Sequence, residues 1–277
     1  MKRVNCYNCG SEVSTFFASE NGFILVKCIS CGLLYVNPRP DDEEIMHAHQ
    51  LGVHKGDKTI NATGIFNATK VPVYKNILED FYGNGFNREI KWLDIGCGHG
   101  EFLVALKKFS KNKILAKGVE PNINKQKSVK KRGLDVGFFD LSKHNELYDI
   151  ISFLNIYSHL PDPPKTISEW GRLLKPGGEL FMETGDAANM EDKDQFRPFY
   201  LPDHLSFASE KIVINILNRC GFEVISIKKY PFIRTDFISV VKELLKLLMR
   251  NKHSRIKYLI RNQNYNTDMF IQARLIN

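Results

Sequence analysis

The sequence predicts an α/β protein built on a mostly parallel sheet of seven strands with helices on both faces. Apolar, strand-like runs alternate with amphipathic helical segments from Ile90 to Tyr230, and a last apolar run, "DMFIQARLIN", ends the chain. Such alternation is typical of parallel strands joined by helices that cover the sheet. A cysteine-bearing segment precedes the sheet, and a helical insertion at about residues 232–265 precedes the last strand.

The elements follow in chain order. Residues 1–40 carry four cysteines, show little helical periodicity and close with "NPRP". Residues 41–89 are expected to form a helical connector or lid, with "DDEE" at a helix start and a second helix near Asn67–Tyr82. Residues 90–277 form the predicted main domain, whose strands before the final one are "IKWLDIG", "ILAKGVE", "LDVGFFD", "YDIISFLN", "GELFMETG" and "FEVISIKKY".

Composition indicates a soluble globular protein. The 277 residues are 25% charged and 43% hydrophobic, with a formal net charge of +8. The N-terminus has no apolar stretch behind its basic residues, and the apolar segment Phe237–Met249 is too short and too charged to span a bilayer. We therefore expect a cytoplasmic protein without a membrane span. Ten Lys/Arg between Lys228 and Arg261 either form a solvated face or attract anionic partners.

Four cysteines form two C-x-x-C-G pairs, Cys6 with Cys9 and Cys28 with Cys31. Thiolates at i and i+3 of a tight turn present two sulfurs to one tetrahedral ion, and the following glycine lets the turn close. In a reducing compartment this pattern indicates metal more than disulfide. Residues 1–40 are thus predicted to be a zinc ribbon. Because protein supplies all four ligands, the Zn²⁺ would be structural.

A glycine-rich turn follows the first strand of the main domain. Gly96, Gly98 and Gly100 alternate directly after Asp94, at the point where a Rossmann-like sheet binds its ligand beyond the strand ends. The spacing is G-x-G-x-G, which weakens a dinucleotide interpretation because that fingerprint is G-x-G-x-x-G. Glu120 ends the next strand, where a carboxylate could accept hydrogen bonds from both hydroxyls of a ribose.

Together these residues resemble a known family. "DIGCGHG" from Asp94, then Glu120, "YDIISFLNIYSHLPDP" and "LLKPGGEL" are similar, in this order, to class I S-adenosylmethionine-dependent methyltransferases. The resemblance covers Ile90 to about Tyr230. It implies that S-adenosylmethionine, and its product S-adenosylhomocysteine, lie against Asp94, Gly96, Gly98, Gly100 and Glu120, with Cys97 inside the turn. It further implies that Asp140 faces the adenine amino group beside Phe139, and that Asn155 lines the pocket near the sulfonium.

Two histidines are candidates for a general base, which an alcohol acceptor would need. His159 in "YSHLPDP" and His204 in "FYLPDHLSF" both fall on loops after sheet strands, on the side expected for the cofactor. Phe196, Phe199, Tyr200 and Phe207 surround His204 in the sequence, and we favour it as the base. His159 is equally consistent with a scaffold role. His99 in the glycine turn is expected to point to solvent, and Cys97 and Cys220 to pack as small apolar residues.

Two functions remain open. The cysteine module ahead of the catalytic domain resembles methyltransferases that tailor sugars, surface glycans and secondary metabolites. This resemblance implies transfer to oxygen or nitrogen of a small polar acceptor that is sugar-like or carried on a phosphate. The alternative is an RNA methyltransferase that docks RNA through the ribbon and basic patches. The ribbon segment carries few basic residues, whereas phosphate contacts require a dense stripe, so nucleic acid is disfavoured. The protein is expected to be a monomer or a homodimer.

Overall fold

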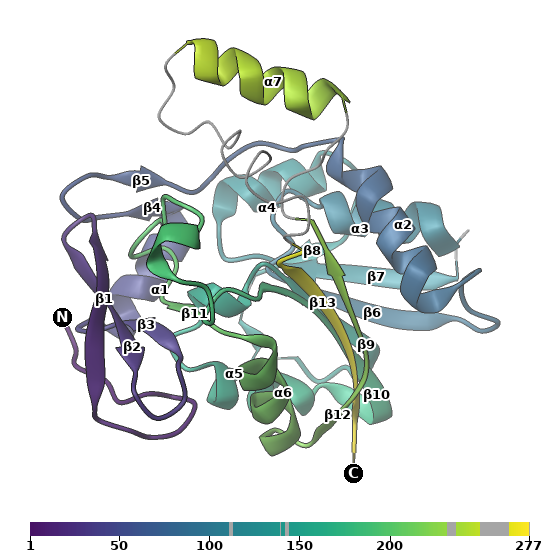
Figure 1. Ribbon diagram of the computed structural model, residues 1–277. Coiled ribbons are helices and arrows are strands. Elements are labelled where there is room, and N and C mark those ends of the chain that lie inside the picture. The colour runs from purple at the N-terminus through teal and green to yellow at the C-terminus, as the bar shows by residue number, and fades with distance from the viewer. Residues whose placement is uncertain (111–112, 139, 142–143, 232–236, 250–265, 277) are drawn as a thin grey trace.

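The computed structural model describes residues 1–277 apart from 111–112, 139, 142–143, 232–236, 250–265 and 277 (Figure 1). Its largest sheet has seven strands in the order β12-β13-β10-β9-β6-β7-β8. The strand bounds are β6 (Ile90–Ile95), β7 (Ile114–Val119), β8 (Val136–Gly137), β9 (Tyr148–Leu154), β10 (Leu174–Gly185), β12 (Phe222–Tyr230) and β13 (Asp268–Leu275). The neighbouring strands β10, β9, β6, β7 and β8 pair in parallel, and β13 runs antiparallel to both of its neighbours, β10 and β12. The predicted seven-stranded, mostly parallel sheet is confirmed.

Both faces of this sheet are covered by helices (Figure 1). Side chains alternate along β6, so Ile90 and Trp92 pack in the core under α2 (Lys70–Tyr82) and α3 (Glu101–Ser110), whereas Leu93 and Ile95 pack on the other face. That second face is covered by α5 (Pro163–Gly171) and α6 (Glu210–Arg219). Helix α4 (Ile123–Lys130) follows β7 and packs beside β8. Short 3-10 turns lie at η2 (Tyr157–His159) and η3 (Asp192–Asp194).

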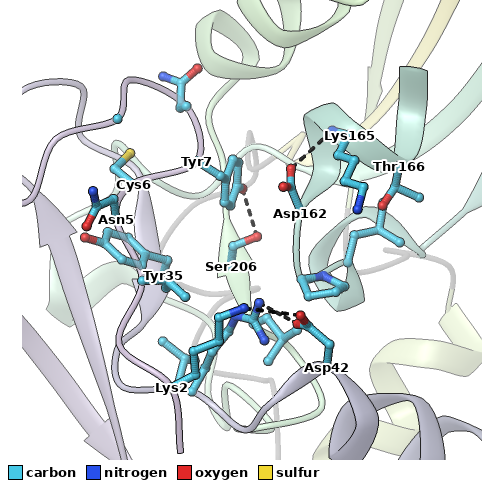
Figure 2. Close-up of a pocket in the computed structure, with 18 of the residues that line it drawn as sticks. Lys2, Asn5, Cys6, Tyr7, Tyr35, Asp42, Asp162, Lys165, Thr166 and Ser206 are labelled. Atoms are coloured by element: carbon cyan, nitrogen blue, oxygen red, sulfur yellow. Dashed lines mark hydrogen bonds and ion pairs between the residues drawn. The ribbon is translucent and has the colours of Figure 1, made fainter. Parts of the chain in front are cut away.

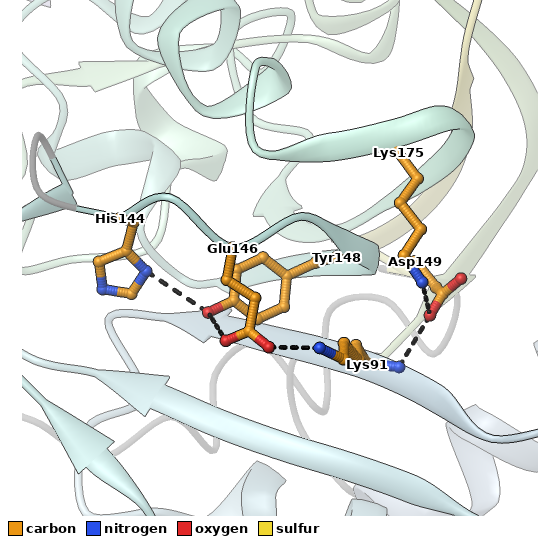
Figure 3. A network of polar contacts seen from close by, with 6 residues as sticks. All are labelled: Lys91, His144, Glu146, Tyr148, Asp149 and Lys175. Carbon is orange, nitrogen blue, oxygen red and sulfur yellow. Dashed lines mark hydrogen bonds and ion pairs between the residues drawn. The ribbon is translucent and has the colours of Figure 1, made fainter.

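A polar network joins the starts of three central strands (Figure 3). The carboxylate of Asp149 in β9 accepts the backbone N–H of Lys91 in β6 at 2.9 Å and the ammonium of Lys175 in β10 at 2.9 Å. Lys91 also reaches Glu146, which lies just before β9. This network fixes β6, β9 and β10 relative to one another at their N-terminal ends. The C-terminal ends of the same strands, which carry the candidate site, are thereby held in register.

The N-terminal segment forms a second, four-stranded sheet. Its order is β1 (Ser14–Glu20), β2 (Phe23–Cys28), β3 (Leu34–Val36) and β11 (Ser206–Phe207). Strand β11 comes from the long loop after β10 and pairs Ser206 with Tyr35, which lies 171 positions earlier in the chain. Leu25 and Leu34 lie in the same buried cluster as Leu93 of the main sheet. Residues 1–40, called the ribbon from here on, therefore share a core with the main domain.

The connector holds both predicted helices, α1 (Asp42–Leu51) and α2. Asp41 caps α1 by accepting the backbone N–H of Glu44 at 2.9 Å, as the acidic helix start indicated. Between the helices lies a small hairpin that the sequence did not indicate, β4 (Val53–His54) paired with β5 (Ile60–Asn61). The expected insertion contributes α7 (Phe237–Leu248), and residues 232–236 and 250–265 of its predicted span lie outside the described residues.

Candidate active site

The glycine turn joins β6 to α3. Gly96, Gly98 and Gly100 have φ values of 70°, 58° and 91°, in the left-handed region that favours glycine. A Cβ atom at Gly96 would lie 2.4 Å from Cδ1 of Ile156, so close packing within the chain excludes a side chain there. A Cβ atom at Gly98 would meet nothing within 4 Å. The backbone of the turn therefore presents an open face at Gly98, where a ligand can approach.

Glu120 lies directly against this open face. The residue follows β7, is 4% exposed, and accepts the backbone N–H of Gly98 on Oε2 at 2.9 Å and that of Asn122 on Oε1 at 3.0 Å. Burial raises the pKa of the carboxyl, while Lys125 and the two N–H groups oppose the rise. Each carboxylate oxygen can accept a further hydrogen bond. Glu120 is thus a fixed, two-oxygen acceptor beside the turn.

Asp94 supports the turn from below. The carboxyl is 2% exposed and accepts the hydroxyl of Ser152 in β9 at 2.6 Å, and that hydroxyl accepts the indole N–H of Trp92 at 2.9 Å. Burial raises the pKa of Asp94 to about 7. The network connects β6 with β9 directly under the point where both strands end.

The other predicted cofactor residues lie around the same strand ends. Asn155 follows β9 with φ 58°, is exposed, and its backbone N–H donates to the carbonyl of Glu183 at 3.1 Å. Cys97 is buried, and a Cβ atom at Gly118 would lie 2.7 Å from its sulfur, so the thiol packs on β7. Asp140 is half-buried just after β8, and Phe139 lies outside the described residues.

The connector packs on the turn. The expectation that His99 points to solvent is wrong, because its Nε2 lies 2.9 Å from the carbonyl oxygen of Thr63. At the end of α1, a Cβ atom on Gly52 would lie 2.6 Å from Nδ2 of Asn122. That amide nitrogen is buried without a hydrogen-bond partner among the described residues. Residues 52–63 therefore cover the space beside Gly98 and Glu120.

Histidines gather around Asp203 at the edge of this space. Oδ1 of Asp203 lies 3.0 Å from Nε2 of His54 in β4 and 3.0 Å from Nδ1 of His159 in η2. Burial alone would lower the pKa of His159, but Asp203 raises it above its usual value. Burial alone would raise the pKa of Asp203, but the two imidazoles hold it well below its usual range. His54 and Asp203 were not predicted as site residues.

His204 and His49 complete the cluster. The rings of His159 and His204 have centroids 4.8 Å apart, and those of His159 and His49 lie 5.9 Å apart. Burial lowers the pKa of His204 to about 4 and that of His49 to about 3. Nδ1 of His204 and Nε2 of His49 are buried without hydrogen-bond partners among the described residues. The structure thus brings together the two predicted histidines, His159 and His204, and adds His54 from β4 and His49 from α1.

The ribbon holds the loop that carries Asp203 and His204. The carboxylate of Glu20, at the end of β1, accepts three successive backbone N–H groups, those of Phe199, Tyr200 and Leu201, at 2.8, 2.6 and 3.2 Å. The next residue, Asn21, donates its side-chain N–H to the carbonyl of Leu201 at 2.9 Å and accepts the backbone N–H of Lys58 on Oδ1. The hairpin between β1 and β2 therefore fastens the acceptor-side loop to the connector.

The four ribbon cysteines converge. One ligand atom from each of Cys6, Cys9, Cys28 and Cys31 lies within 4.8 Å of the others, with Sγ–Sγ distances of 3.4 Å for Cys6–Cys31 and 3.5 Å for Cys9–Cys28. Sulfurs about 3.8 Å apart would suit a tetrahedral ion with bonds of about 2.3 Å. Gly10 and Gly32 have φ values of 76° and 79°, and their N–H groups close the turns on Cys6 and Cys28. This donor set fits Zn²⁺.

A separate groove of about 670 Å³ opens between the ribbon and α5 (Figure 2). In it the hydroxyl of Tyr7 donates to Ser206 at 2.9 Å, and Lys2 and Arg39 both pair with Asp42. None of the predicted cofactor or catalytic residues lines it. The groove therefore lies apart from the strand ends that carry the candidate site.

The sequence matches the model of a family described as "Methyltransferase domain" over residues 72–227, more than half of the chain. The chain belongs to this methyltransferase family. The match begins within α2, ends within β12 and includes the glycine turn, Glu120, His159 and His204. The predicted methyltransferase class is therefore confirmed.

Curated relatives match part of the chain. A ubiquinone biosynthesis O-methyltransferase of Saccharophagus degradans is 30% identical over 107 residues, which are 35% of this chain and 44% of that protein. One of the same name from Klebsiella pneumoniae is 26% identical over 120 residues, 41% of this chain and 49% of that protein. The alignments thus span less than half the length of these relatives.

Solved structures share the fold. The [4+2]-cyclase SpnF superposes with a TM-score of 0.54 at 16% identity, over 77% of this chain and 83% of that one. A coclaurine N-methyltransferase bound to N-methylheliamine and S-adenosylhomocysteine gives a TM-score of 0.50 at 14% identity, over 80% and 72%. Because one of these neighbours is a cyclase, the fold alone does not define a reaction, and the reaction must be argued from the site. No helix among the described residues is long and apolar enough to span a membrane.

Proposed function

We propose that this protein transfers the methyl group of S-adenosylmethionine to an oxygen of a small polar acceptor. The carboxylate of Glu120, fixed by the Gly98 and Asn122 N–H groups beside the open face of the turn, is the observation that carries the proposal. A ribose diol can donate to its two oxygens, and the buried, unpartnered Nδ2 of Asn122 offers a further donor. These residues fit the cofactor. When bound, the cofactor supplies an electrophilic methyl group on a sulfonium.

The acceptor would lie between the glycine turn and the histidine cluster. Ile156 packs on Gly96, and His159 comes three residues later in the same segment, which supports placing the acceptor between the turn and the cluster. The backbone of Phe199 hydrogen-bonds His204, while the buried Nδ1 has no partner among the described residues and presents its lone pair. An acceptor hydroxyl could lose its proton to Nδ1 as its oxygen attacks the methyl carbon. His204 is therefore proposed as the base, with His159 beside it.

Oxygen is favoured over nitrogen for two reasons. An alcohol needs a base, and His204 is placed to be one, whereas a free amine needs none. The curated relatives are named as O-methyltransferases. The expectation of a sugar-like acceptor remains a prediction, and so does Zn²⁺ at the four cysteines, where it would hold the ribbon hairpin that supports the loop carrying His204.

The test compares His204→Ala with His47→Ala, an exposed histidine of α1. Labelled S-adenosylmethionine is offered with a panel of phenols and nucleotide sugars, and S-adenosylhomocysteine binding is followed by calorimetry. Loss of a general base should lower kcat about 100- to 10,000-fold in His204→Ala while binding is kept, and His47→Ala should match the wild type. Full activity in His204→Ala would refute the assignment. Methyl transfer to RNA but to none of the panel would refute the acceptor class.

A further inference from the structure

The geometry points to a second metal site, in which His49, His159 and Asp203 bind a divalent transition metal ion beside the acceptor space. One ligand atom from each of the three residues lies within 4.8 Å of the others. They come from α1, η2 and the loop after β10, and none belongs to the cysteine site. Two imidazoles with one carboxylate are a donor set that binds Zn²⁺ or Fe²⁺ and leaves coordination positions open.

The contacts around His159 and Asp203 are those of oriented metal ligands. Nδ1 of His159 lies 3.0 Å from Oδ1 of Asp203 and 2.8 Å from its carbonyl oxygen, so the two side chains already bring one nitrogen and one oxygen to the spacing of two ligands of one ion, which would replace the proton between them. His54, 4% exposed, reaches Oδ1 of Asp203 at 3.0 Å. Metal-binding histidines and carboxylates are usually held by such outer hydrogen bonds. His54 is thus a positioning residue for the carboxylate.

His49 supplies the independent observation. Its Nε2 is buried and has no hydrogen-bond partner among the described residues. Leaving a buried polar atom unpaired destabilises the folded protein. The ring centroids of His54 and His159 lie 5.4 and 5.9 Å from that of His49, so polar rings surround this nitrogen without forming a hydrogen bond to it. A metal ion bonded to Nε2 removes this destabilisation, and the Asp203 carboxylate partly neutralises its charge.

The use of this ion rests on the proposed function. An acceptor hydroxyl in an open coordination position would lie next to His204, whose ring is 4.8 Å from that of His159. The ion makes the hydroxyl more acidic. Its proton moves to Nδ1 of His204, the oxygen–carbon bond to the methyl group forms, and the carbon–sulfur bond breaks with its electron pair left on sulfur. His204 then returns the proton to water.

Metal content tests the site without any acceptor. The full-length protein is stripped of metal, refilled with Co²⁺, freed of excess ion and analysed for cobalt per chain and by absorption spectroscopy. Thiolate-bound Co²⁺ has intense charge-transfer bands that an imidazole–carboxylate site lacks, so the two sites are distinguishable. The wild type and His47→Ala should each hold two ions, and His49→Ala only the thiolate-bound one. His54→Ala should bind the second ion about 10- to 100-fold more weakly.

A wild type that holds only the thiolate-bound ion would overturn the site, and so would equal cobalt content in His49→Ala and His47→Ala. Calorimetry with S-adenosylhomocysteine shows whether each variant is folded. Methyl transfer is then measured separately. If the second ion binds but its removal leaves transfer unchanged, the site stands and its catalytic use is overturned. If transfer to oxygen is never observed, the proposed function fails while the metal result still decides the site.

Discussion

Replacing Glu120 with alanine should weaken binding of S-adenosylhomocysteine while leaving the fold intact. In the structure both carboxylate oxygens already accept a backbone N–H, at 2.9 and 3.0 Å, so the side chain is oriented before any ligand arrives. The ligand therefore gains two charge-assisted hydrogen bonds without paying the entropy of ordering Glu120.

The magnitude follows from these contacts. Hydrogen bonds to a charged group contribute about 1.5–3 kcal/mol. We take this range for the whole diol contact, because removal of the carboxylate also lets water solvate the ribose site. At about 1.4 kcal/mol per tenfold, the Kd should rise about 10- to 150-fold. In the free protein, alanine leaves the N–H groups of Gly98 and Asn122 without their acceptor, so a modest loss of thermal stability accompanies the weaker binding.

Isothermal titration calorimetry measures the effect directly. Asp135→Ala is the matched control, because Asp135 is an exposed acid just before β8 whose structural contact is made by its backbone carbonyl. It should bind as the wild type does. Glu120→Gln keeps the size of the side chain but places its NH₂ group, a donor, against one of the two backbone N–H donors. The Kd of this variant should fall between those of the wild type and Glu120→Ala. Equal Kd values for Glu120→Ala and Asp135→Ala would refute the placement of the ribose at Glu120.

Three further outcomes are expected. Elemental analysis should find zinc at the four cysteines, and Cys9→Ser should lower both its content and the melting temperature, since a structural ion contributes folding free energy; unchanged zinc in that variant would count against the site. Glu20→Ala should lower kcat with S-adenosylhomocysteine affinity unchanged, because Glu20 holds residues 199–201 rather than the cofactor turn. Equal losses of kcat and of S-adenosylhomocysteine affinity would contradict this role. Burial, with Asp268 nearby, raises the pKa of Glu183 from 4.5 to about 8, so the folded state favours the protonated acid and loses stability as pH rises from about 4.5 to about 8. Glu183→Gln should remove this loss and be more stable than wild type at pH 8 by up to about 4 kcal/mol in urea unfolding, and parallel pH profiles for the two proteins would contradict it.

The strands of the main sheet could be predicted because each carries a local pattern. "IKWLDIG" and "YDIISFLN" are mainly apolar runs of strand length, and both form buried parallel strands. The two-residue strands β4, β5 and β11 have no such pattern, because pairing by another segment creates them. Strand β11 exists only because Ser206 meets Tyr35 of the ribbon.

The same distinction separates the parts of the site. The glycine turn and the cysteine pairs are local motifs. Their spacing predicts the backbone conformation of the turn and the convergence of the four sulfur atoms. His49, His54 and Asp203 have no informative spacing, and they meet only after the connector packs on the strand ends. His159 and His204 could be suggested one by one from their places after strands. Their contact, and the carboxylate between His54 and His159, required the fold.

The ribbon's contacts argue that it acts as part of the catalytic unit. Glu20 binds the loop that carries Asp203 and His204, Asn21 joins that loop to the connector, and β11 extends the ribbon sheet with residues just beyond His204. The glycine turn and Glu120 belong instead to the main sheet, where the aspartate network of β6 and β9 supports them. Unfolding of the ribbon should therefore disturb the acceptor side of the site before it disturbs cofactor binding. Stripping metal from the cysteines should thus abolish methyl transfer at a stage where S-adenosylhomocysteine still binds. Simultaneous loss of both would mean that the two halves of the site unfold together.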